Sequence, residues 1–153
     1  MNPDVERFTA VAQNFCTLLE TATELELAEL RAKLLQALPE LYLAATKLPD
    51  LFADVDVEHE PLKLDLLVAL SKHLGDNDTY WQVFDPTGKD KPSAGSLADD
   101  LSEIRFDLQQ GLLALERGAP VDAVVWEWRF GFENHWGRHL VDALRAIHWQ
   151  VAW

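Results

Sequence analysis

Histidine and carboxylate side chains recur at helical spacing near the C-terminus of the chain. His135 and His139 are one helical turn apart, and Asp142 follows three residues later on the same face. Two imidazoles and a carboxylate in this pattern can bind a divalent metal ion when neighbouring helices add further ligands. The sequence has no H-E-x-x-H motif and no repeated E-x-x-H motif, and histidines that donate to groups within the fold are commoner than metal ligands. We therefore expect no bound metal and no other cofactor.

Two further carboxylates, Asp100 and Asp107, lie seven residues apart on the shoulder of the preceding helix. Arg129 falls within the apolar stripe of the last helix, and a buried guanidinium needs a carboxylate or aromatic partner because it stays protonated. We predict that Arg129 pairs with Asp100 or Asp107. The alternative is that Arg129 reaches water along Trp126 or Trp136. The polar network expected between the last two helices, as a functional site or a structural one, consists of Asp100, Asp107, Arg129, His135 and His139.

Tryptophan is concentrated in the same region. Five of the six tryptophans lie in residues 126–153, and each indole combines a large apolar area with an N–H that needs an acceptor. Tryptophan and arginine are also enriched where protein partners bind. We therefore expect the aromatic C-terminal helix and a nearby loop to bind an unidentified protein or peptide; the alternative is that these aromatics are core residues. The predicted binding residues are Tyr80, Trp81, Phe84, Trp128, Arg129 and Trp136.

The elements that would position these side chains are helices. Apolar residues recur every three or four positions, and cap residues mark helix starts, with Asn2 before the first helix and Ser96 before the fourth. A fifth helix starts at Pro120 and carries both histidines of the C-terminal pattern. The sequence thus predicts one all-α domain over residues 1–153, an antiparallel bundle of about five helices. Residues 75–95 are the only long irregular segment expected, an aromatic loop that packs on the body.

The balance of charge restricts the partners. The chain of 153 residues carries 26 acidic and 13 basic residues, a formal net charge of −13 at pH 7. This charge repels phosphate groups, so we expect neither nucleic acid nor a membrane surface as partner, and basic proteins or cationic ligands fit better. The sequence shows no signal peptide and no apolar run long enough to span a bilayer, which favours the cytoplasm. The single cysteine, Cys16, fits a reducing compartment and is expected in the core.

Three segments form a distinctive combination: YWQVFDP, GSLADDLSEIRFDLQQGL and VWEWRFGFENHWGRHLVDALRAIH. Together they resemble an uncharacterised bacterial family of small all-helical proteins, domain of unknown function 5063. The resemblance covers about residues 60–150. It implies a bacterial source and supports the helical fold, but it assigns no activity, substrate or cofactor, so the roles of the residues named above rest on their spacing.

Two classes of function remain. The leading expectation is a non-enzymatic interaction protein, an adaptor or small regulator, whose aromatic face binds a partner helix or a basic peptide. The alternative is a metal-dependent or acid–base enzyme with a site between the last two helices. A solvent-open pocket that contains the polar network would favour the enzyme, and a sealed network would favour a structural role. A homodimer fits either class, because Trp149 and Trp153 leave apolar surface to cover, although Trp153 is expected to dock on the body.

Overall fold

The computed structural model describes residues 1–151, and Trp153, which was expected to dock on the body, lies outside them. The helices are α1 (Pro3–Glu20), α2 (Leu27–Ala45), α3 (Asp65–Leu74), α4 (Leu97–Glu116), α5 (Val121–Asn134) and α6 (Trp136–Gln150). The strands are β1 (Thr79–Gln82) and β2 (Ser93–Ser96), and single 3₁₀ turns occupy Ala22–Glu24 and Gly75–Asn77. The protein is therefore predominantly helical, as predicted, with one small sheet in addition.

Side-chain caps set two of the helix starts that the sequence predicted. The Asn2 side chain accepts a hydrogen bond from the Asp4 amide at 2.7 Å at the start of α1. The Ser96 hydroxyl accepts one from the Asp99 amide at 3.1 Å at the start of α4. Each cap satisfies a backbone donor that the first helical turn leaves without a partner. The second cap fixes where α4 begins and thus where Asp99 and Asp100 lie.

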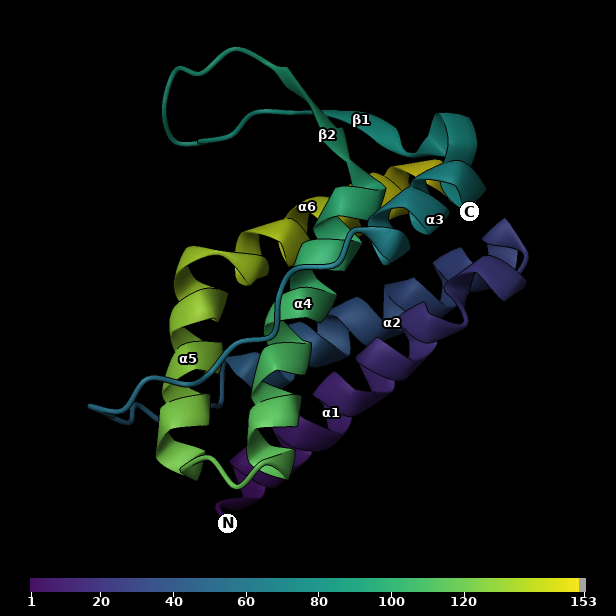
Figure 1. Cartoon of the computed structure of the whole chain (residues 1–153). Coiled ribbons are helices and arrows are strands. Elements are labelled where there is room, and N and C mark those ends of the chain that lie inside the picture. The colour runs from purple at the N-terminus through teal and green to yellow at the C-terminus, as the bar shows by residue number, and fades with distance from the viewer. Residues whose placement is uncertain (152–153) are drawn as a thin grey trace.

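The core is built around α4, which packs against α1, α3, α5 and α6. Figure 1 shows α4 in the middle of the molecule, with α1 and α2 on one side and α5 on the other. The Phe8 ring of α1 contacts the Trp128 ring of α5 with centroids 4.9 Å apart, and Phe8 also meets Trp136 of α6 at 6.1 Å. Burial of side chains of this size stabilises the fold by about 2–3 kcal/mol each. The aromatic residues of the C-terminal region thus join three helices.

The single C-terminal helix that the sequence predicted is two helices. Its first part ends at Asn134 and its second begins at Trp136, because His135 between them has φ −140° and ψ −85°, outside the helical region. The helix α6 turns away from α5 at this break (Figure 1). The sequence has no proline at this position, so the break between the two helices was not predicted. Residues 1–151 therefore contain six α-helices where about five were expected.

Residues 75–95, predicted as an irregular aromatic loop, contain a β-hairpin. Its strands pair antiparallel, with Tyr80 opposite Gly95 and Trp81 opposite Ala94. Each strand has four residues, which is too short for a period of two to stand out in the sequence. Successive side chains of a strand point to opposite faces, so Tyr80 is partly buried against the helices while Trp81 is exposed. The hairpin extends from the ends of α3 and α4 that Figure 1 places together.

A second irregular segment, residues 46–64, was not expected from the sequence. It joins α2 to α3 and crosses α4 in Figure 1. The Glu60 amide donates a hydrogen bond to Gln110 Oε1 at 2.6 Å, and His59 Nε2 lies 2.6 Å from Glu127 Oε2. These contacts satisfy backbone and charged groups along the segment, so it holds a fixed path without being a helix or strand.

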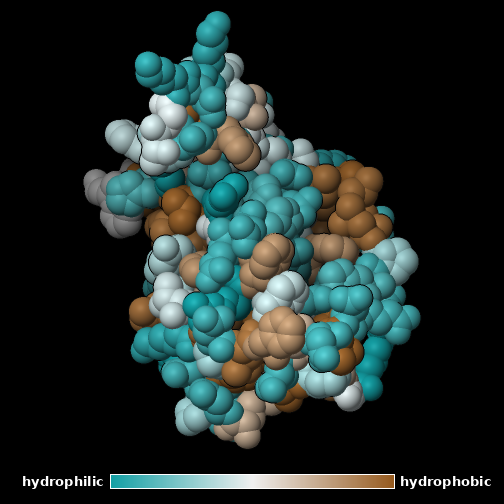
Figure 2. Space-filling view, turned by 90° about the vertical axis from the view of Figure 1, so that its left-hand side faces the viewer, coloured by the Kyte–Doolittle hydropathy of each residue, from teal (hydrophilic) through white to brown (hydrophobic). Residues whose placement is uncertain are grey.

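The exposed apolar residues are distributed over several elements. Figure 2 shows hydrophobic residues in separate patches among hydrophilic ones. Trp81 of the hairpin and Trp149 of α6 are exposed, and the exposed rings of Trp126 and Phe130 on α5 stack with centroids 5.1 Å apart. None of the helices within residues 1–151 combines the length and apolar composition that crossing a membrane requires.

Candidate functional site

A groove of about 640 Å³ lies between the hairpin and the helices. Its helical side is formed by the first turn of α4, the break between α5 and α6, and the first half of α6. The polar side chains on that side are Asp99, Asp100, Asn134, His135, Arg138, His139 and Asp142. The opposite side consists mainly of hairpin residues, namely Thr79, Gln82, Phe84, Ala94, Gly95 and Ser96, with Leu67 of α3.

Asp100 is the buried centre of the helical side, with an exposed fraction of 4%. Its Oδ1 lies 2.8 Å from Nδ1 of His139 on α6. Its Oδ2 accepts a hydrogen bond from the hydroxyl of Tyr80 in β1. One carboxylate therefore links the hairpin to α4 and α6, with both of its oxygens satisfied. Among residues 1–151, Nε2 of His139 has no hydrogen-bond partner, and the His139 side chain lines the groove.

These contacts shift the pKa of all three groups. Burial raises the pKa of Asp100, against the opposing effect of the hydrogen bonds from His139 and Tyr80. The hydrogen bond to Asp100 raises the pKa of His139, so its imidazolium form persists to higher pH. Burial, together with the hydrogen bond to Asp100, raises the pKa of the Tyr80 hydroxyl, which stays protonated as a donor. Titrating groups perturbed by burial and specific partners are typical of functional sites when they line an open groove.

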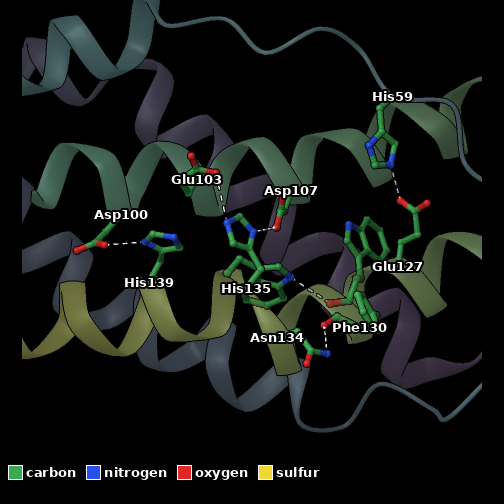
Figure 3. A network of polar contacts seen from close by, with 11 residues as sticks. His59, Asp100, Glu103, Asp107, Glu127, Phe130, Asn134, His135 and His139 are labelled. Carbon is green, nitrogen blue, oxygen red and sulfur yellow. Dashed lines mark hydrogen bonds and ion pairs between the residues drawn. The ribbon is translucent and has the colours of Figure 1, made fainter. Parts of the chain in front are cut away.

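His135 lies at the break between α5 and α6 and contacts the next carboxylates along α4 (Figure 3). Its Nδ1 is 2.6 Å from Oδ2 of Asp107, and its Nε2 is 3.6 Å from Oε2 of Glu103. The rings of His135 and His139 meet edge to face with centroids 5.1 Å apart. The structure thus brings together Asp100, Asp107, His135 and His139, and it adds Glu103, which the sequence did not single out.

Arg129, the fifth residue of the expected polar network, lies elsewhere and does not line the groove. Its Nη1 donates to the Leu48 carbonyl oxygen at 2.9 Å, and its Nε donates to Glu133 Oε1 at 3.1 Å. The prediction that Arg129 pairs with Asp100 or Asp107 is therefore wrong. It assumed a buried guanidinium, whereas the side chain is partly exposed and finds a carboxylate one turn along its own helix.

Trp128 and Trp136, predicted to line a binding surface, are core residues with exposed fractions of 2% and 0%. The Trp128 indole N–H donates to the Leu108 carbonyl oxygen at 3.2 Å, and that of Trp136 donates to the Trp128 carbonyl oxygen at 3.1 Å. The prediction is wrong for both residues, because the polar group of each indole is satisfied inside the fold and leaves nothing for a partner.

The other aromatic residues of the predicted surface belong to the hairpin region. Phe84 is 74% exposed and lines the groove. Tyr80 is partly buried and holds Asp100, and Trp81 is exposed on the opposite face of β1. The segment from Tyr80 to Phe84 therefore contributes one aromatic ring to the groove rather than a continuous aromatic wall.

Three potential metal ligands approach one another in the groove. One ligand atom from each of Asp99, Asp100 and His139 lies within 4.8 Å of the other two. The sequence had instead suggested His135, His139 and Asp142, but His135 is engaged by two carboxylates of α4. Asp99 was missed, because the rotation of the helix alone directs it to solvent, whereas the hairpin folds over the first turn of α4 and makes Asp99 part of the groove.

Asp78, at the start of the hairpin, was also missed. It is 8% exposed, and its Oδ1 accepts hydrogen bonds from the Ala98 amide at 2.7 Å and the Ser96 hydroxyl at 3.0 Å. Nothing in the acidic cluster at residues 76–78 distinguishes Asp78 from a solvated residue of a connecting segment. Its carboxylate instead satisfies donors at the start of α4 and fixes the hairpin against that helix.

The fold also occurs in a solved structure. The crystal structure of protein BF1032 from Bacteroides fragilis, a structural genomics target, is similar to this chain with a TM-score of 0.82 and 25% sequence identity, over 96% of this chain and 91% of that chain. No curated protein matches the sequence. Residues 1–152 match a family described as a domain of unknown function, DUF5063. The chain therefore belongs to the DUF5063 family, which confirms the resemblance seen in the sequence.

Proposed function

We propose that the protein is a binding module that takes a basic segment of a partner protein or peptide into the groove under the hairpin. This proposal keeps the interaction function expected from the sequence but moves the binding surface away from Trp128 and Trp136. The observation that carries it is the lining of the groove, where two partly buried carboxylates that have no hydrogen-bond partner in the described part of the chain lie opposite an exposed aromatic ring.

The charges in the groove favour a cationic occupant. Asp99 and Asp142 line it, and neither carboxylate has a hydrogen-bond partner among residues 1–151. Arg138 also lines the groove. The pKa of Asp85 in the hairpin turn is lowered mainly by hydrogen bonds from Thr87 and to a smaller extent by the charge of Arg138. Lysine or arginine of a partner would form charge-assisted hydrogen bonds with the two open carboxylates. The formal net charge of −13 would also speed the approach of a basic partner.

The apolar side of the groove supports the same kind of occupant. Phe84, Ala94 and Leu67 offer apolar area opposite the carboxylates. The aliphatic stem of lysine or arginine packs on such surface while its charged end reaches a carboxylate, and a guanidinium also stacks on an aromatic ring. The volume of about 640 Å³ lies within the range of pockets that enclose a ligand or a short peptide segment.

A peptide-library measurement tests this proposal. Full-length protein, with chelator present to remove metal ions, is incubated with short synthetic peptides in which lysine, arginine, acidic and apolar residues are varied. We expect saturable binding of peptides that combine a basic residue with an apolar neighbour, and no binding of acidic peptides. Equal binding of acidic and basic peptides, or no binding of either, would contradict the proposal.

Matched variants locate the binding surface. Phe84→Ala and Asp142→Asn are each expected to weaken the selected peptide by about tenfold, the size of one lost contact of 1–2 kcal/mol. Phe52→Ala is the control, because Phe52 is 83% exposed and does not line the groove. Loss of binding in Phe52→Ala, with full binding in Phe84→Ala, would place the partner on another surface.

A second candidate function is acid–base catalysis on a small substrate in the same groove. It is favoured by the pair in which Asp100 fixes Nδ1 of His139 while Nε2 remains available to exchange a proton. A panel of ester, amide and phosphoester substrates tests it, with His139→Gln as the inactive reference. Turnover that is lost in His139→Gln and retained in Phe52→Ala would support catalysis over simple binding.

A further inference from the structure

We propose that Asp99, Asp100 and His139 form a binding site for one divalent transition-metal ion. The site lies on the helical side of the groove, between the first turn of α4 and the first half of α6. It does not depend on the peptide-binding proposal, because metal binding is measured with the ion alone.

The geometry of the three side chains carries the proposal. Their ligand atoms lie within 4.8 Å of one another, whereas ligands on one tetrahedral ion at about 2.1 Å lie about 3.4 Å apart. No hydrogen bond within residues 1–151 holds the Asp99 carboxylate, so its side chain is free to turn toward an ion. Asp100 and His139 are already fixed against each other at 2.8 Å. An ion that binds both of these atoms displaces the proton between them, so Asp100 and His139 separate slightly while Asp99 turns toward the ion.

The surroundings of the site favour a cation. Asp142 follows His139 by three residues on α6 and lines the same groove. Burial and the nearby charge of Asp100 raise the pKa of Asp142, which means that these carboxylates repel each other. A divalent ion offsets this repulsion. Tyr80 donates to Asp100 from the hairpin and orients that carboxylate, as residues around metal ligands commonly do.

The ligand types indicate which ions fit. One imidazole together with carboxylate oxygens suits zinc, manganese and iron, whereas magnesium and calcium prefer oxygen ligands alone. No thiolate takes part, since the only cysteine is buried in α1. We therefore expect the affinity to fall in the order Zn²⁺, Mn²⁺, Mg²⁺, which follows the general order for nitrogen and oxygen ligands.

Calorimetric titration of metal-free, full-length protein with zinc, manganese and magnesium chlorides tests the site. We expect one ion per chain and at least about tenfold weaker zinc binding in Asp99→Asn. Asp99→Asn is expected to keep the melting temperature of the wild type, because its carboxylate makes no hydrogen bond or ion pair among residues 1–151. His139→Gln is expected to abolish binding. Absence of saturable zinc binding, or unchanged binding in Asp99→Asn, would overturn the proposal.

Two controls separate this site from other histidines and from folding effects. His135→Gln is expected to retain zinc binding, because the His135 ring is occupied by Asp107 and Glu103. Loss of binding in His135→Gln with retention in His139→Gln would move the ion elsewhere and overturn the proposal. Cobalt supplies a second readout, since its visible absorption reports the ligands directly. The cobalt spectrum should appear in the wild type and in His135→Gln and be absent in His139→Gln.

Discussion

Asp100 on α4 and His139 on α6 form a partly buried contact of 2.8 Å, and the second oxygen of the same carboxylate accepts a hydrogen bond from the Tyr80 hydroxyl of β1. Three elements that lie far apart in the sequence thus meet at one side chain. Together with Asp78, this carboxylate holds the hairpin over the helices and so shapes the groove. The same contact engages only Nδ1 of His139, whose side chain lines the groove, so one carboxylate serves both the fold and the site.

Removal of this carboxylate should destabilise the protein strongly. Asp100→Ala leaves the Tyr80 hydroxyl and Nδ1 of His139 without their shared acceptor, which should lower the free energy of unfolding by about 2–4 kcal/mol. Asp99→Ala, on the adjacent residue, should change it by less than about 1 kcal/mol. Urea unfolding followed by circular dichroism measures both. Equal effects of the two substitutions would show that Asp100 does not link the three elements.

Gly111 should not tolerate a larger side chain. In a helix, replacing glycine with alanine gains about 1 kcal/mol, but a Cβ atom at Gly111 would overlap the buried indole of Trp128. That ring is buried, and its N–H donates a hydrogen bond to the Leu108 carbonyl oxygen, so it cannot easily move away. The steric clash should therefore outweigh the gain in helix propensity, and Gly111→Ala should lower the free energy of unfolding by about 1–3 kcal/mol. Glu116→Ala, at an exposed position of α4, is the control with little expected change. A stabilised Gly111→Ala protein would contradict the packing described for Trp128.

Cys16 should be chemically inert in the folded protein. Burial raises the pKa of the Cys16 thiol to about 12. Because the folded pKa lies above that of an unfolded thiol, about 8.5, the folded state favours the protonated form. This contribution to stability is full below the unfolded pKa and is lost as the pH rises from about 8.5 toward 12. Alkylation by iodoacetamide at pH 8, followed by mass spectrometry, should be slow without urea and fast with it; equal rates would contradict the burial of Cys16.

Arg129 should matter for stability and not for the groove. Arg129→Ala removes the contacts with Leu48 and Glu133, and because the guanidinium is partly exposed we expect a loss of only about 0.5–1.5 kcal/mol. Peptide binding should be unchanged, since Arg129 does not line the groove. Unfolding and peptide titrations on the same variant test both statements. Weakened peptide binding at unchanged stability would instead show that Arg129 belongs to the binding surface, as the sequence suggested.

The sequence predicted the parts of the molecule that follow from local rules. The caps at Asn2 and Ser96 depend on neighbouring residues, so their helix starts could be placed in advance. Helical rotation also placed His135 and His139 in a polar network with Asp100 and Asp107, and the structure pairs His135 with Asp107 and His139 with Asp100. These features need only the helical repeat and the packing of two helices side by side.

The rest depends on contacts between distant segments. The hairpin is held by Asp78 and Tyr80, which contact groups at the start of α4. The sequence of its four-residue strands does not predict these contacts. The same hairpin covers Asp99 and makes it part of the groove, although its position on the helix alone would leave it facing solvent. The non-helical backbone at His135 has no proline to signal it. Tertiary contacts thus determine the hairpin, the place of Asp99 and the break at His135, which the pattern of residues along the sequence does not predict.

The most direct test of groove binding is nuclear magnetic resonance on isotope-labelled protein titrated with the selected basic peptide. Binding in the groove should shift the Gly95 amide and the His139 ring signals in proportion to the bound fraction. The indole signals of Trp128 and Trp136, which are buried, should stay in place. Shifts confined to the exposed Trp126 or Trp149, with Gly95 and His139 unchanged, would contradict the proposal that the groove is the binding site.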